Sequence, residues 1–181
     1  MYVGTGRHHC TIRNLRIRTQ HQEVIGTIDI GESNSQRDAD VFNPSTGRVI
    51  ARVPLATASE AHAAGEAAAD ALPAWSQTPA GDRARVLFHF RQKLSDQYEE
   101  IAALVTREHG KTLAEARAEV QRGIEMVEFA CGAPSLLMGD CLANIAPEVD
   151  ADTMRHPVGV CVGITPYNFP NMVPLWMFPV A

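Results

Sequence analysis

The chain has 181 residues, of which 45% are apolar, so it is long enough to fold around one hydrophobic core. Its formal net charge of -5 argues against a nucleic-acid partner, and no apolar run is long enough to cross a membrane. The four cysteines lack the spacing of a metal site, which favours free thiols in a reducing compartment over a disulfide framework.

The N-terminal residues 1–37 are interpreted as a basic leader. Residues 1–22 contain no acidic side chain but carry several basic ones: Arg7, Arg13, Arg16, Arg18, His8, His9 and His21. This composition fits either an organelle transit peptide or a leader without a defined role, so a cytoplasmic location is expected, with a mitochondrial matrix as the alternative. A metal site at His8, His9 and Cys10 is disfavoured, because three consecutive side chains do not all turn toward one ion.

A β-hairpin and a helix are expected first along the folded part of the chain. A turn cluster between two β-prone runs predicts antiparallel strands within residues 40–53. Thr57 and Glu60 have the spacing of a capping box, which predicts a helix over residues 57–72. Pro73 is expected to end this helix.

Three more helices are predicted from apolar side chains that recur at helical spacing. They cover residues 82–94, 98–109 and 112–130. Gly110 is expected to end the second of them as a left-handed cap, because glycine adopts that backbone conformation without strain.

Arg122 lies on the longest predicted helix and shares one face with Met126 and Phe129. One interpretation is a structural side chain, either snorkelling or paired with a nearby glutamate, with these candidates: Glu115, Glu119 and Glu125. The other is a site for a carboxylate, because the planar guanidinium holds a carboxylate with two parallel hydrogen bonds.

Two kinds of strand are predicted in the C-terminal part of the chain. Residues 140–145 and 152–156 read as short polar-edged strands that project from the body. Residues 158–164 are small or β-branched, which predicts a strand buried on both faces. Cys161 lies within this segment and is therefore expected to be a buried, inert thiol.

A loop framed by Pro166 and Pro170 follows the predicted buried strand. It presents Tyr167 and Asn168 beyond the carboxyl end of that strand, where α/β proteins usually bind ligands. Asn168 is either part of such a site or a residue that caps a helix beginning near Pro170, since asparagine is a favoured helix cap.

These segments resemble the aldehyde dehydrogenase superfamily and, within it, the CoA-acylating methylmalonate-semialdehyde dehydrogenases. The resemblance covers residues 41–181. Its general parts are residues 41–47 and 107–112, and its more specific parts are residues 119–125 and 163–179.

The resemblance implies an α/β fold in which residues 38–181 supply the helices and first strand of a Rossmann-type NAD-binding domain. Residues 140–156 would form part of an oligomerisation sheet, and the full-length enzyme would be a homo-oligomer. Enzymes of this family oxidise an aldehyde by cysteine attack and hydride transfer to NAD. In this subfamily coenzyme A accepts the acyl group, so that malonate or methylmalonate semialdehyde yields acetyl-CoA or propionyl-CoA with loss of carbon dioxide.

Carried over position by position, the resemblance implies that the Asn168 amide binds the oxyanion of the covalent intermediate. Thr165 and Tyr167 match positions that contact the cofactor, although Tyr167 replaces the more usual phenylalanine or tryptophan. Arg122 matches an arginine directed at the substrate carboxylate.

The family's catalytic cysteine, its glutamate and the lysine that holds the adenine ribose are expected beyond Ala181. The chain by itself is therefore expected to be inactive, because the covalent mechanism needs a nucleophile. Two alternatives stand beside this one: a non-catalytic remnant that docks on a complete subunit, and a different aldehyde dehydrogenase such as a succinate-semialdehyde type.

Overall fold

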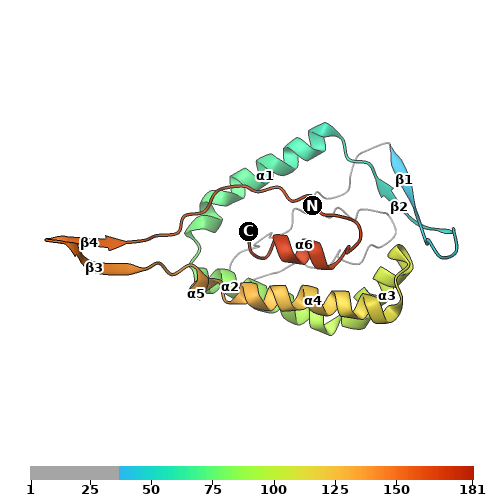
Figure 1. Ribbon diagram of the computed structural model, residues 1–181. Helices are drawn as coiled ribbons and strands as arrows, with labels where there is room; N and C mark the ends of the chain where they lie inside the picture. The colour runs from blue at the N-terminus through green and yellow to red at the C-terminus, as the bar shows by residue number, and fades with distance from the viewer. Residues whose placement is uncertain (1–36) are drawn as a thin grey trace.

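Helices form the body of the structure, and a β-hairpin lies at each end of that body (Figure 1). The structure is a computed structural model that describes residues 37–181. The basic leader, apart from Arg37, and the metal donors considered at its His8, His9 and Cys10 lie outside the described residues.

The first hairpin pairs strand β1 (Asp38–Phe42) with strand β2 (Val49–Pro54) in antiparallel register, as the sequence predicted. The Asn43 side chain organises the turn by accepting a hydrogen bond from the Ser45 amide at 2.9 Å. Gly47 has a φ of +66°, a left-handed conformation that glycine adopts without strain. Asparagine and glycine thus form the tight turn that these residue types favour.

Helix α1 (Ala58–Gln77) begins with the predicted capping box. The Thr57 side chain accepts from the Glu60 amide, and the Glu60 carboxylate accepts from the Thr57 amide. The expectation that Pro73 ends the helix is wrong, because Pro73 lies inside it. The fixed φ of proline is close to a helical value, so the ring removes one hydrogen bond without forcing the chain out of the helix. The last turn then closes through side chains: the Ser76 hydroxyl donates to the Pro73 carbonyl at 3.0 Å and the Thr78 hydroxyl to the Ala74 carbonyl at 3.1 Å.

Three further helices are confirmed, with bounds within about two residues of those predicted. They are α2 (Ala80–Asp96), α3 (Tyr98–His109) and α4 (Leu113–Cys131), and a single turn, α5 (Ala133–Leu136), follows the last of them. Gly110 caps α3 with a φ of +85°, and its amide donates to the Thr106 carbonyl at 3.0 Å.

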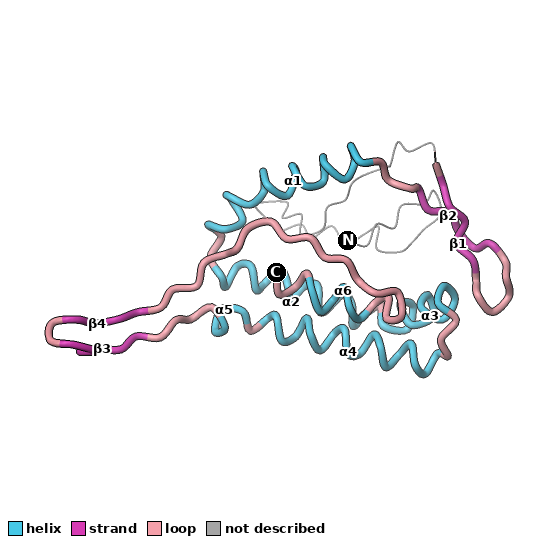
Figure 2. The backbone as a smooth tube through the Cα atoms, turned by 45° about the horizontal axis from the view of Figure 1, so that its top comes forward, coloured by secondary structure: helices cyan, strands magenta, loops and turns pink. Residues whose placement is uncertain are grey.

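The hydrophobic core lies where α2 and α3 pack against α4. Figure 2 shows α4 running along the body beside these helices. Burial of one large aliphatic side chain stabilises a fold by about 1.5–3 kcal/mol, so this layer supplies most of the cohesion. Its buried members are Phe90, Leu94, Ala102, Val105, Ala116, Val120, Ile124, Val127 and Leu175.

The second hairpin consists of β3 (Cys141–Ala146) and β4 (Val149–Asp152), and it extends away from the helices (Figures 1 and 2). Its second strand begins earlier than predicted, because the chain already reverses at Glu148, whose φ is +63°. At the base of the hairpin the Asp140 amide donates to the Thr153 hydroxyl at 2.7 Å, and the Thr153 amide donates to the Asp140 carbonyl at 2.9 Å.

Residues 158–164 do not form the predicted buried strand. The segment is extended without strand pairing, and its large side chains are exposed, with Val158 at 93%, Val162 at 81% and Ile164 at 90%. A strand is buried on both faces only when neighbouring strands and covering helices enclose it, and no strand lies beside this segment in residues 37–181. Cys161 is likewise exposed rather than buried.

The final helix, α6 (Met172–Met177), lies against α4 (Figure 2). Gly123 permits this contact, because a Cβ built at Gly123 would lie 2.6 Å from Leu175 Cδ1 and 3.2 Å from Asn171 Oδ1. Leu175 is only 4% exposed and has little freedom to turn away. The small residue on α4 therefore sets how closely α6 and the preceding loop approach the core.

We predict that Gly123→Ala destabilises the chain by about 1–3 kcal/mol, because the new methyl group would push α6 away from α4. The matched control is Gly65→Ala in α1, where a Cβ would meet nothing within 4 Å. That control should be neutral or stabilising by about 0.4–1 kcal/mol, since alanine favours helix. Urea unfolding of both variants measures the difference, and equal effects would remove Gly123 as the determinant of the contact.

Candidate functional site

The loop at residues 165–171 joins the exposed segment 158–164 to α6 and carries three of the predicted site residues. Thr165 is half-buried, Asn168 is exposed and Tyr167 is 92% exposed. None of these three side chains makes a hydrogen bond to another described residue. Their hydroxyl, phenol and amide groups are therefore free to meet a ligand.

Asn168 does not cap the following helix, so the capping interpretation is wrong. The N-cap position of α6 belongs to Asn171, and Asn171 makes no side-chain capping bond. The helix starts later than Pro170, at Met172, and the amides of Asn171 and Met172 find an acceptor on another helix. This leaves the Asn168 carboxamide without a structural task in the described part of the chain.

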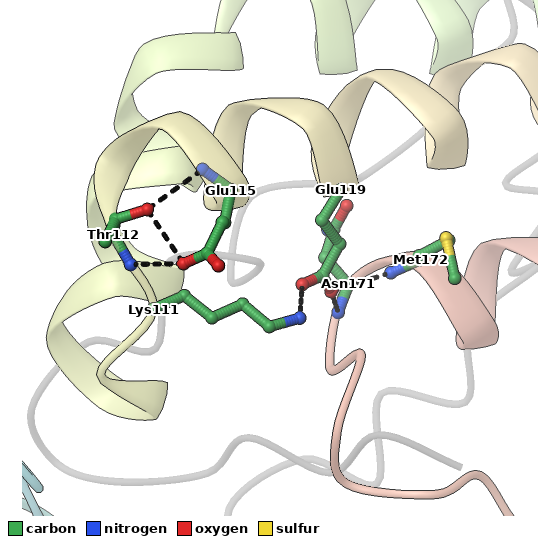
Figure 3. Close-up of polar contacts among 6 residues, drawn as sticks. All are labelled: Lys111, Thr112, Glu115, Glu119, Asn171 and Met172. Carbon is green, nitrogen blue, oxygen red and sulfur yellow. Dashed lines mark hydrogen bonds and ion pairs between the residues drawn. The ribbon is translucent and has the colours of Figure 1, made fainter.

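That acceptor is Glu119 of α4, whose side chain is buried (Figure 3). One carboxylate oxygen, Oε1, accepts from the Asn171 amide at 2.8 Å and from the Met172 amide at 3.2 Å. The other oxygen, Oε2, lies 2.5 Å from the Lys111 ammonium. A buried charge is tolerated only when such partners replace water, and here both oxygens are satisfied.

Lys111 makes a second contact with the loop. Its ammonium lies 3.9 Å from the centre of the Phe169 ring, a cation–π geometry. Phe169 directly follows Asn168, so Lys111 and Glu119 hold the backbone on the C-terminal side of the free carboxamide.

The N-terminus of α4 is fixed next to Lys111 by a second capping box (Figure 3). The Thr112 hydroxyl donates to Glu115 at 2.8 Å, the Thr112 amide donates to the same oxygen at 3.0 Å, and the Glu115 amide donates to the Thr112 hydroxyl at 3.3 Å. The bonds from the Thr112 hydroxyl and then the Thr112 amide favour the ionised form, so they lower the pKa of Glu115 below its usual range.

Arg122 is exposed on α4, and the ion-pair interpretation is wrong within residues 37–181. Each glutamate considered as a partner is engaged elsewhere: Glu119 with Lys111, Glu115 with Thr112, and Glu125 with Gln121. Arg122 is the neighbour of Gly123, which packs against the end of the loop. The structure therefore places Arg122 on the helix that holds the loop, but no hydrogen bond joins it to Thr165, Tyr167 or Asn168 in the described chain.

Sequence reasoning did not identify Glu119 and Lys111 as a pair. A signal was present, because Glu119 occupies the apolar stripe of α4 between Ala116 and Gly123. A carboxylate at a buried position requires a cation or several donors. The identity of the donors could not be read from this pattern, because the loop amides lie about fifty positions further along the chain.

Two other kinds of site are not found in the described residues. No group of three or more metal-binding side chains lies close enough together within residues 37–181 to hold a metal ion. The same residues contain no helix with the length and apolar character needed to span a membrane.

Comparison with known sequences gives one consistent family match. The model of the aldehyde dehydrogenase family matches residues 31–181. Malonate-semialdehyde dehydrogenase 2 of Oceanobacillus iheyensis is 55% identical over 150 residues, which are 83% of this chain and 31% of that protein. The malonate-semialdehyde dehydrogenase of Bacillus pumilus is 52% identical over 160 residues, 88% of this chain and 33% of that protein. The chain thus spans about a third of the length of these relatives.

Comparison with solved structures agrees. The methylmalonate-semialdehyde dehydrogenase of Oceanimonas doudoroffii superposes with a TM-score of 0.78 at 47% identity, over 82% of this chain and 30% of that one. A protein of Sinorhizobium meliloti 1021 that was crystallised with NAD superposes with a TM-score of 0.77 at 42% identity, over the same shares.

We predict that Thr112→Ala destabilises the chain by about 1 kcal/mol at about pH 7 and by less at about pH 3. Because the Glu115 pKa is lowered from 4.5 in the folded chain, its contribution is present above 4.5 and is lost as the pH falls through the folded value. Urea unfolding across this range measures the effect. The control is the same Thr112→Ala change made in a Glu115→Gln background, where residue 115 has no charge to lose. There Thr112→Ala should destabilise the chain equally at every pH. With Glu115 present, a Thr112→Ala effect of equal size at every pH would contradict the linkage.

Proposed function

Because the chain belongs to the aldehyde dehydrogenase family, we propose that it supplies part of the active site of an NAD-dependent, CoA-acylating semialdehyde dehydrogenase. The family match confirms the resemblance seen in the sequence and the α/β fold class that it implied. The proposed substrates are malonate and methylmalonate semialdehyde, which are supported by the names of the similar proteins. The products would be acetyl-CoA or propionyl-CoA, carbon dioxide and NADH.

The observation that carries this proposal is the free carboxamide of Asn168 on an anchored loop. Its N–H groups have no partner in the described chain, while the backbone that follows is held by Glu119 and Lys111. When a thiolate adds to an aldehyde, the carbonyl oxygen becomes an oxyanion. A donor that is already in place stabilises this charge as it develops, by about 2.7–4 kcal/mol in comparable sites.

The proposed role of Arg122 is to hold the carboxylate of the semialdehyde. The guanidinium is always charged and presents a planar fork of donors. It has no ion-pair partner among the described residues, and it lies on the helix that contacts the loop. Binding the carboxylate there would orient the aldehyde end of a short substrate with respect to the helix.

NAD fits the loop in chemical terms, because Tyr167 offers an almost fully exposed ring and Thr165 a hydroxyl without a protein partner. We assign these two residues to holding the cofactor, which when bound accepts the hydride of the aldehyde carbon. Coenzyme A, as the acyl acceptor, follows from the resemblance, and no described residue is assigned to it.

We assign the nucleophilic thiol to a residue outside the described residues 37–181. Burial, followed by the nearby charge of Glu128, raises the pKa of the Cys131 thiol, so this thiol is a poor nucleophile. Cys141 lies at the start of the projecting hairpin, far along the chain from the loop, and the Cys161 thiol contacts the Gly159 carbonyl at 3.6 Å. None of these positions matches the nucleophile motif that the resemblance implies.

The hairpin β3–β4 is proposed as part of the sheet through which subunits of a homo-oligomer associate. It projects from the body (Figure 1). The apolar side chains of Leu142, Ile145 and Val149 are exposed. Exposed apolar strands of this kind are typical of surfaces that pair with another chain. A cytoplasmic location is proposed as well, in keeping with the bacterial relatives.

The substrate assignment is tested in a hybrid enzyme in which residues 38–181 replace the matching segment of the Oceanobacillus iheyensis protein. We predict that Arg122→Leu lowers kcat/KM for malonate semialdehyde about 10- to 100-fold, because a charge-assisted contact is lost. Use of propanal should be unchanged, since propanal has no carboxylate. Arg85→Leu on α2 is the control and should affect neither substrate. Equal losses on both aldehydes in Arg122→Leu would contradict the carboxylate role.

In the same hybrid, Asn168→Ala is predicted to lower the rate of acylation about 10²- to 10³-fold while KM for NAD stays nearly constant. Asn168→Asp keeps the size of the side chain but removes its N–H donors, and it should lose as much activity. Rapid-mixing measurement of NADH formation gives the acylation rate. An unchanged rate in both variants would remove Asn168 from the oxyanion site.

A further inference from the structure

We propose that Glu119 is a positioning residue, which together with Lys111 clamps the loop on α4 and thereby fixes where the Asn168 carboxamide stands. This inference rests on the proposed function of Asn168. It assigns a task in the reaction to the buried pair of Glu119 and Lys111.

Both carboxylate oxygens of Glu119 take part in the clamp. Glu119 Oε1 receives two consecutive amides of the loop end, at 2.8 Å and 3.2 Å, and Oε2 receives the Lys111 ammonium at 2.5 Å. The two side chains are 1% and 15% exposed. Because both oxygens are engaged away from water, the carboxylate is held in one orientation. The two amides bound to it are therefore held in one position as well.

The origin of the cap is the second step of the argument. A serine or aspartate at the N-cap position would accept from an amide two or three residues on, within α6 itself, and would leave α6 free to shift over the core. Here the side chain at the N-cap position, Asn171, makes no capping bond, and the acceptor comes from α4 instead. A cap from a second helix gives the unpaired amides an acceptor, and it also ties the end of the loop to the rigid core layer.

The third step concerns the distance along the chain between the clamp and Asn168. Lys111 holds the Phe169 ring at 3.9 Å, one residue after Asn168, and Glu119 holds the amide of Asn171, three residues after it. Gly123 lets this end of the loop lie directly on α4. The Asn168 side chain stays exposed while the residues that follow it are anchored, which is the arrangement that a preorganised donor needs.

The alternative is that Glu119 only stabilises the fold, as any paired buried carboxylate would. Loss of one partner of a buried pair destabilises a protein generally, so a lower melting temperature does not separate the two roles. Two measurements do separate them: local exchange of the clamped amides, and coupling between Glu119 and Asn168 in catalysis.

The first measurement is hydrogen–deuterium exchange of the 181-residue chain. In Glu119→Ala, the Asn171 and Met172 amides should exchange about tenfold faster or more, because they lose a charged acceptor, while α2 and α3 keep their protection. Glu128→Ala is the matched control, since Glu128 lies on the same helix but forms an exposed pair with Arg91. Uniform acceleration over all helices, or no change at the two amides, would overturn the clamp.

The second measurement is a double-mutant cycle in the hybrid enzyme, well below the melting temperature of each variant. Glu119→Gln keeps the shape and one acceptor but releases Lys111, so kcat for malonate semialdehyde should fall about tenfold with KM for NAD unchanged. In Asn168→Ala the same change should have no further effect, because no carboxamide is left to position. Lys111→Met should behave like Glu119→Gln, and Lys111→Arg, which keeps the cation, should restore most of the rate.

The outcomes separate this inference from the proposed function. If Asn168→Ala lowers the acylation rate and Glu119→Gln multiplies that loss, Glu119 acts independently of Asn168 and the positioning role is wrong. If Asn168→Ala leaves the rate unchanged, the proposed oxyanion site fails, and the positioning role in catalysis falls with it. In that case the exchange measurement still decides whether Glu119 holds the loop.

Discussion

The buried carboxylate of Glu119 is the interaction on which the arrangement of the site depends. It joins the α3–α4 junction, through Lys111, to the start of α6, through two amides. A charge at 1% exposure is stable only with all of these partners, so the pieces that provide them are held together or lost together. The loop that bears Asn168 lies between those pieces.

Helix α4 provides the surface for this interaction because one of its stripes is apolar and one position is glycine. Val120, Ile124 and Val127 pack against α2 and α3, and Gly123 admits Leu175 of α6 to the same core. The side chains of residues 158–164, by contrast, have little to pack on in the described chain. The anchored part of the site is therefore the part that α4 supports directly.

The residues proposed for the chemistry also differ in whether α4 supports them. Asn168 would meet the developing oxyanion from the anchored loop, and Arg122 would hold the substrate carboxylate from α4 itself. Both groups would therefore be positioned by the same helix, α4. Such sharing favours reaction because the relative position of two binding groups then costs little entropy when the substrate arrives. Tyr167 and Thr165 lie on the N-terminal side of the loop, where no clamp is seen in the described residues.

The sequence by itself determined the elements whose causes are local. The capping box of Thr57, the left-handed cap at Gly110 and the helical stripe of α4 depend on side chains within a few positions of each other, so pattern alone predicted them. The continuation of α1 through Pro73 also has a local cause, since the φ of proline is close to a helical value. Tertiary structure decided that residues 158–164 stay unpaired and that Glu119 rather than Asn168 caps α6. In both cases the deciding partner lies far along the chain or is missing from the described residues, and a pattern of neighbours carries no information about it.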